Sequence, residues 1–184
     1  TTLFSKRSEL HLPNKWPAYF SKANKTDVWD LKRNKYLDMF CAVGTSILGY
    51  NNHNVNKSVL QNIKKGNLTT LNCPEEVYLS KQIIKHHPWA SMAKFTRGGG
   101  EANAVAIRIA RSCAKNKNVA FCGYHGWHDW YLSANINSKK NLDQHLMPGL
   151  SYDGIPESLE NTSFPFPYND LRYLLKLIEK KKIG

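Results

Sequence analysis

A run of glycines between a strand-like and a helical segment is the feature that most limits the fold of this chain. Met92–Thr96 is short and β-prone, Gly98-Gly99-Gly100 follows, and residues 101–113 place apolar side chains at helical spacing. Asn116–Asn118 predicts a turn, and Val119–Cys122 predicts a buried strand. The order strand, glycine turn, helix, strand predicts a right-handed βαβ unit with a parallel sheet, and therefore an α/β fold.

The helix after the glycines is expected to bury one side and to expose the other. Arg108 and Arg111 are expected to reach outward. The side expected to be buried is formed by Ala102, Val105, Ala106, Ile109, Ala110 and Cys113.

The remaining segments give weaker signals. Residues 1–25 are polar with scattered aromatic side chains and predict an irregular arm. Two β-prone runs around a polar stretch predict a hairpin of Val28–Leu31 with Tyr36–Phe40. Residues 135–169 predict loops, and helices are expected at 55–63, 74–87 and from 171 to 178.

The glycine turn has two interpretations. The N-terminus of a helix offers free N–H groups and a partial positive charge, and glycine lets an anion approach the backbone. Gly98-Gly99-Gly100 is therefore a candidate phosphate site, although neither Gly-Lys-Ser/Thr nor GxGxxG is present. The alternative is a tight turn that only glycine fits, with nothing bound.

An aromatic segment, residues 123–131, follows the second predicted strand and is expected beside the glycine turn, because ligands of open α/β sheets lie at the carboxyl ends of strands. Tyr124 could stack on a planar ring, and His125 could hydrogen-bond near it. His125 and His128 lack a third ligand at suitable spacing, which argues against a metal site. The remaining aromatic side chains are expected to pack against a partner domain: Trp127, Trp130 and Tyr131.

Composition excludes several classes of protein. Of the 184 residues 41% are hydrophobic, which is enough for a core, and the net charge of +12 is spread along the chain as on a solvated basic surface. A nucleic-acid-binding module remains the rival for this charge, but no recognition motif accompanies it. The four cysteines form no CxxC pair, and no signal peptide or membrane-spanning run is visible. A reducing cytosol is the expected location.

Five motifs in order over about residues 17–131 resemble class III pyridoxal-phosphate-dependent aminotransferases, in particular the aminomutase-like members. The most specific stretch is Gly98–Ala102 with Ala106–Arg111, which is similar to the family pattern SGTEAxxxAiRlAR. The other matching segments are Val28–Leu31 with Tyr36–Met39, Ile47–Asn51, Glu75–Leu79 and Tyr124–Gly126.

The resemblance implies a fold-type I, aspartate-aminotransferase-like architecture with pyridoxal 5'-phosphate as cofactor. It implies an N-terminal arm and small-domain segment over 1–70 and the start of the large, cofactor-binding domain over 71–184. By position, N–H groups of Gly99 and Gly100 would hold the phosphate, and Tyr124 would stack on the ring with His125 next to it. Ala42 and Val43 would line the substrate pocket, and Glu101 and Arg108 would be structural. It further implies a small-molecule amino donor and acceptor and a homodimer of the complete protein, without nucleic acid or membrane.

The sequence departs from the family pattern at positions that contact the phosphate and the substrate in the family. Gly98 and Gly100 replace a Ser and a Thr, so two hydroxyl contacts to phosphate are lost, and Val43 replaces a Trp of the aminomutases. Residues 132–169 instead resemble a branch associated with surface-sugar pathways. No Schiff-base lysine is expected here, because Lys139, Lys140 and Lys180–Lys182 indicate surface positions. We therefore expect an N-terminal fragment that is inactive alone; the alternative is a non-catalytic pseudo-enzyme or assembly partner.

Overall fold

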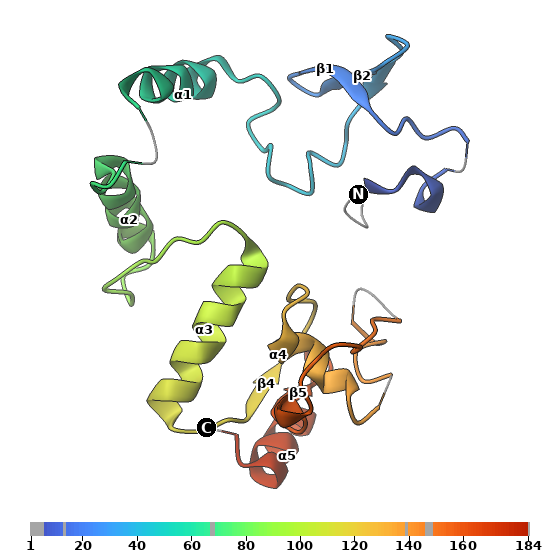
Figure 1. The fold of residues 1–184 in the computed structure, drawn as a ribbon, viewed down its shortest axis with the longest axis vertical. Helices are drawn as coiled ribbons and strands as arrows, with labels where there is room; N and C mark the ends of the chain where they lie inside the picture. Colours follow the sequence, from blue (N-terminus) through green and yellow to red (C-terminus); the bar gives the residue numbers. More distant parts are fainter. Residues whose placement is uncertain (1–5, 13, 67–68, 139, 146–148, 184) are drawn as a thin grey trace. The chain divides into compact units, whose positions relative to one another are not determined.

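A computed structural model describes residues 6–12, 14–66, 69–138, 140–145 and 149–183 (Figure 1). The chain divides into two compact units, Thr1–Pro74 and Glu75–Gly184, which are described separately. The expected domain boundary at 70/71 concerns the complete protein and stays a prediction. Phe4, an aromatic residue of the expected arm, and Lys139 lie outside the described residues.

The first unit contains an antiparallel sheet in the order β1-β2-β3. The strands are β1 (Phe20–Asn24), β2 (Asp27–Asp30) and β3 (Lys35–Leu37). The expected hairpin is confirmed by the β2–β3 pairing, in which Val28 lies opposite Tyr36. The irregular arm is corrected in part: it contains a 3₁₀ turn, η2 (Ser8–Leu10), and β1, which pairs with β2.

The Trp29 ring makes side-chain contacts with lysines of both neighbouring strands. The Nζ atoms of Lys22 on β1 and Lys35 on β3 lie 5.1 and 5.7 Å from the centroid of the Trp29 ring. Lys35 also forms an ion pair with Asp27 at 2.9 Å. These contacts join residues of separate strands, so the local pattern of residues 20–24 does not reveal the strand.

The first unit also contains α1 (His53–Lys65), which confirms the helix expected at 55–63. Asn52 caps it, because its side chain accepts the N–H groups of Asn54 and Val55. Gly66 ends the helix at a φ of 88°, a conformation that glycine adopts without a steric cost.

The second unit contains a parallel pair, β4 (Val119–Phe121) and β5 (Ser163–Pro165), with Val119 opposite Ser163. α3 (Gly99–Ala114) precedes β4 in the chain and lies beside the strand pair (Figure 1). The other helices are α2 (Pro74–His86), which spans the division between the units, α4 (Asp129–Leu132), α5 (Leu171–Lys181) and the 3₁₀ turns η3 (Ser133–Asn135) and η4 (Glu157–Leu159). The helices expected at 74–87, 101–113 and 171–178 are confirmed. A parallel strand pair is present, but it joins β4 to β5, so the expected βαβ unit of Met92–Thr96 with Val119–Cys122 is wrong.

The expected strand at Met92–Thr96 is wrong: this segment forms no strand in the described structure. A strand needs a neighbour to complete its hydrogen-bond ladder, and the parallel partner of β4 is β5. β5 lies in a region expected to be loops, because Pro165 and Pro167 oppose a strand prediction. Proline is accepted at the edge of a sheet, where its missing N–H is not required.

The core of the second unit lies around β4 and α4. The buried apolar residues are Val119, Phe121, Trp130, Tyr131, Leu132, Ala134 and Leu142. Trp130 and Tyr131 therefore pack within their own unit, which corrects the expected packing against a partner domain, whereas Trp127 is exposed. The rings of Phe121 and Tyr131 lie 5.1 Å apart.

α3 packs with a different side from the one expected. Ala104 and Ile107 contact the core, whereas Ile109 on the predicted side is 54% exposed. Arg111 does not reach outward: it donates to the carbonyl oxygens of Lys117, at 2.8 Å, and Thr162, at 3.4 Å. Apolar residues of α3 occur on all sides of the helix, so their spacing alone does not show which side is buried. None of the described helices is long and apolar enough to cross a bilayer.

Candidate functional site

The N-terminus of α3 lies at the glycine turn. Gly98 is the N-cap, and Ala102 is the first residue whose N–H bonds back, to the Gly98 carbonyl at 3.0 Å. The N–H groups of Gly99 and Gly100 precede that bond and have no acceptor within the helix. A β-carbon at Gly98 or Gly99 would meet no atom within 4 Å, so this side of the turn is open. An anion has both donors and space here.

The aromatic segment packs against this turn. A β-carbon at Gly126 would lie 3.2 Å from the Cα of Gly100, so the two backbones meet with no side chain between them. The Asn103 side chain on α3 donates to the His125 carbonyl at 3.3 Å. Gly126 has a φ of 100°, which favours glycine for a second reason. The structure thus brings Tyr124 and His125 to the turn that holds Gly99 and Gly100.

Tyr124 and His125 are both half-buried. The Tyr124 ring meets the ring of Tyr131 edge-on at 5.8 Å. Nε2 of His125 hydrogen-bonds to the Cys122 carbonyl at 2.7 Å, which fixes the imidazole at the end of β4. Among the described residues, no three His, Cys, Asp or Glu side chains, His125 and His128 included, form a group that could hold a metal ion.

His145 is a further residue of this region that sequence patterns did not indicate. Its Nδ1 accepts the N–H of Gly123 at 3.0 Å, directly after β4. This bond places the proton of the neutral ring on Nε2. Burial lowers the pKa of His145, and the nearby His125 lowers it further. His145 is 22 positions from Gly123, so no local spacing connects the two.

Ala42 and Val43, the expected substrate-lining residues, lie in the first unit in an unusual turn. Cys41, Ala42 and Val43 have φ values of 49°, 50° and 59°, and Gly44 follows at 81°. A left-handed backbone costs an L-residue about 1–2 kcal/mol, and a β-branched residue such as Val43 adopts it very rarely. Such strain concentrates at functional sites, and this is the observation that motivates a role for the turn.

Asp38 holds this turn in place. Its Oδ1 accepts the N–H groups of Phe40 at 2.7 Å and Cys41 at 3.1 Å. Its Oδ2 accepts the Tyr50 hydroxyl at 2.5 Å. Tyr50 in turn exchanges two backbone hydrogen bonds with Lys25, next to β1. The hydrogen bond from Tyr50 is the largest cause of a lowered pKa of Asp38.

We expect Asp38→Asn to flatten the acid dependence of stability in the first unit. Because the folded pKa of Asp38 lies below its unfolded value, its stabilisation is complete above the unfolded value of about 3.9 and is lost as pH falls through the folded value. Urea unfolding of the chain and of Asp38→Asn, from neutral pH to below about pH 3, measures this difference. Equal pH profiles of the two proteins would contradict the bonding described for Asp38.

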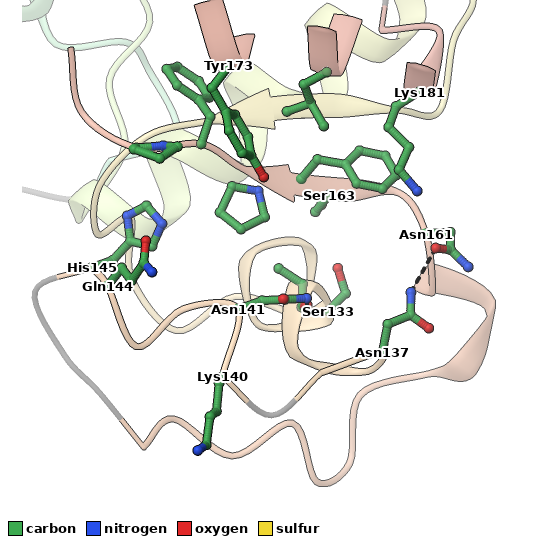
Figure 2. Close-up of a pocket in the computed structure, with 16 residues that line it drawn as sticks. Ser133, Asn137, Lys140, Asn141, Gln144, His145, Asn161, Ser163, Tyr173 and Lys181 are labelled. Atoms are coloured by element: carbon green, nitrogen blue, oxygen red, sulfur yellow. Dashed lines mark hydrogen bonds between the residues drawn. The ribbon is translucent and has the colours of Figure 1, made fainter. Parts of the chain in front are cut away.

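A cavity of about 520 Å³ lies in the second unit between η3, the following loop, β5 and α5, and His145 is one of the residues that line it (Figure 2). None of the site residues expected from the sequence lines it. Several of its polar side chains are already bonded within the chain: Asn137 donates to Asn161 at 2.7 Å, and Asn141 donates to the Ala134 carbonyl at 2.6 Å. The glycine turn, which has free donors, is therefore the better candidate site.

Comparison with known proteins identifies the family of this chain. The sequence pattern of "Aminotransferase class-III" matches residues 12–166. The chain is 31% identical over 172 residues to 3-aminobutyryl-CoA aminotransferase of Cloacimonas acidaminovorans, covering 93% of this chain and 37% of that protein. It is 33% identical over 171 residues to glutamate-1-semialdehyde 2,1-aminomutase of Methanocaldococcus jannaschii, covering 91% and 38%. The chain belongs to the class III aminotransferase family.

The fold is that of fold-type I pyridoxal-phosphate enzymes, as expected. The FumI protein of Sphingopyxis sp. MTA144, solved in its PLP internal aldimine form, has a TM-score of 0.78 and 23% identity, covering 95% of this chain and 38% of that one. Pyridoxal phosphate is thus confirmed as a cofactor among the structural neighbours. This chain spans less than two-fifths of the length of the relatives named here.

The residues of the second unit fit the phosphate of this cofactor. The free N–H groups of Gly99 and Gly100 and the open space beside Gly98 and Gly99 suit a phosphate group. The neighbouring aromatic segment offers Tyr124 to a planar ring.

Proposed function

We propose that this chain is the N-terminal part of a pyridoxal-phosphate-dependent aminotransferase or aminomutase that moves an amino group between small molecules. The observation that carries the proposal is the packing of the aromatic segment on the glycine turn, where Gly126 meets Gly100. When bound, the cofactor supplies an electron sink for reactions at the substrate carbon that bears the amino group. In this proposal, the Schiff-base lysine and the acid that faces the pyridine nitrogen come from a part of the complete protein outside these residues.

The residues of this chain bind and orient the cofactor. N–H groups of Gly99 and Gly100 hold the phosphate, and the positive end of α3 favours its charge. Tyr124 covers one face of the ring, and its contact with Tyr131 fixes its position. His125 lies next to it, held by the Cys122 carbonyl. Ala42 and Val43, in the turn fixed by Asp38, line the substrate pocket.

The complete protein is proposed to be a cytoplasmic homodimer. Many large apolar side chains of the described residues remain exposed, among them Met39 at 87%, Ile47 at 84% and Ile109 at 54%. Exposed apolar surface on this scale is typical of surfaces that another part of an assembly covers. Sedimentation equilibrium of the complete polypeptide tests the dimer, and a monomer at micromolar concentration would contradict it.

The proposal predicts that the complete native polypeptide retains pyridoxal phosphate through dialysis and transfers an amino group. The intact mass from the native source should exceed the 21.0 kDa of this chain. Transfer is measured with an isotope-labelled amine donor and a panel of keto and aldehyde acceptors. A native mass of 21.0 kDa, with no cofactor retained, would contradict the catalytic proposal and leave a non-catalytic relative of the family.

A further inference from the structure

The imidazole of His128 occupies the space beside Gly100. A β-carbon built on Gly100 would lie 2.7 Å from Cδ2 and 2.8 Å from Nε2 of His128, closer than real β-carbons approach other atoms. A hydroxyl-bearing side chain at position 100, as in the family pattern, therefore cannot coexist with this ring position. The ring nitrogen Nε2 instead stands at the first turn of α3.

His128 is held in this position from both sides. Its carbonyl accepts the N–H groups of Tyr131 at 2.9 Å and Leu132 at 3.2 Å, and both of those side chains are buried in the core. Two positions earlier, Gly126 contacts Gly100. Within the described residues the ring nitrogens of His128 make no hydrogen bond, so a ring N–H is available as a donor at the glycine turn.

We propose that Nε2 of His128 donates a hydrogen bond to the cofactor phosphate and takes the place of the hydroxyl group missing at Gly100. The inference rests on the proposed function, and it adds a binding residue to the backbone donors described above. A β-carbon at Gly98 or Gly99 would meet no atom within 4 Å, so there is space for a phosphate beside the glycine turn, and the His128 ring lies next to Gly100 in that turn. A hydrogen bond from a ring N–H to a phosphate oxygen is charge-assisted and therefore stronger than a neutral one.

The test measures dissociation constants of the complete polypeptide for pyridoxal phosphate and for pyridoxal, which lacks the phosphate, by equilibrium dialysis. In His128→Ala the affinity for pyridoxal phosphate is expected to fall about tenfold, which is the usual effect of losing a hydrogen bond to a charged group. The affinity for pyridoxal is expected to stay unchanged. His128→Gln keeps an N–H donor and is expected to recover most of the affinity. His53→Ala, on the exposed start of α1 in the other unit, is the matched control and is expected to bind both ligands normally.

An exchange of side chains separates binding from packing. Gly100→Thr alone is expected to lower the affinity for pyridoxal phosphate, because the new β-carbon displaces the ring of His128. Gly100→Thr combined with His128→Ala provides both the space and a hydroxyl donor, and is expected to bind better than either single variant.

Two results would overturn the inference. One is an unchanged affinity of His128→Ala for pyridoxal phosphate. The other is an equal loss of affinity for pyridoxal and for pyridoxal phosphate, which would indicate that His128 has a packing role only. A wild-type polypeptide that binds neither ligand would refute the proposed function, and this inference with it. If the wild-type polypeptide binds pyridoxal phosphate and His128→Ala binds it equally well, only this inference is refuted and the proposed function stands.

Discussion

Tyr131→Ala is expected to lower the free energy of unfolding of the second unit by about 4 kcal/mol, the usual cost of truncating a fully buried aromatic side chain. Tyr131 is 0% exposed, and its ring lies 5.1 Å from Phe121 and 5.8 Å from both Tyr124 and Trp130. Truncation therefore leaves a cavity and removes the support of Tyr124. We expect cofactor binding to weaken together with stability. Urea unfolding of this variant and the parent chain measures the loss.

Tyr131→Phe is the matched control. The Tyr131 hydroxyl is buried without a hydrogen-bond partner among the described residues, and burial raises its pKa to about 12. Its removal is therefore expected to be neutral or to stabilise by about 1 kcal/mol. Trp127→Ala is a second control, because that side chain is 66% exposed. A loss in Tyr131→Phe as large as that in Tyr131→Ala would show that the hydroxyl has a partner.

Gly126→Ala is expected to reduce both stability and cofactor affinity. Two effects of the new methyl group destabilise the protein at this position. The φ of 100° is strained for alanine, and the β-carbon would lie only 3.2 Å from the Cα of Gly100. The backbone strain contributes about 1–2 kcal/mol, and separating the aromatic segment from the glycine turn adds about 1 kcal/mol or more. The affinity for pyridoxal phosphate is expected to fall by about tenfold or more, since that loss corresponds to about 1.4 kcal/mol.

Gly154→Ala separates the two costs. Gly154 also has a positive φ, of 84°, but a β-carbon there would meet no atom within 4 Å. Its substitution carries the backbone strain alone, so stability should fall while cofactor affinity stays unchanged. If both variants lowered affinity equally, or if neither did, the contact of Gly126 with Gly100 would not support the site.

Helices were predictable from the sequence because their signals are local. Apolar residues at helical spacing indicate α1 and α5, and Pro74 followed by acidic residues indicates the start of α2. The β2–β3 hairpin is equally local. These elements follow from residues that are neighbours in the chain.

The errors concern contacts between distant residues. The segment Met92–Thr96 has the composition of a strand but no neighbouring strand, whereas β5 has two prolines nearby but pairs with β4. The buried side of α3 could not be chosen from a helix with apolar residues on every side. In each case the decision depends on which partner is present, and a local pattern does not contain that information.

The candidate site was predictable only in part. Gly99 and Gly100 were indicated by a glycine turn before a helix, and Tyr124 and His125 by their place after a buried strand. No signal in the sequence places His128 at the phosphate, because its contact with Gly100 depends on the return of the chain to α3. The left-handed turn at Cys41–Gly44 also has no local signal, because only its last residue is glycine.

The most direct test of the proposed function is a crystal structure of the complete polypeptide grown with pyridoxal phosphate. We predict the phosphate at the N-terminus of α3, within hydrogen-bond distance of the N–H groups of Gly99 and Gly100, with the ring against Tyr124. Cofactor bound at another place, or a glycine turn that remains empty at saturating cofactor, would contradict the account.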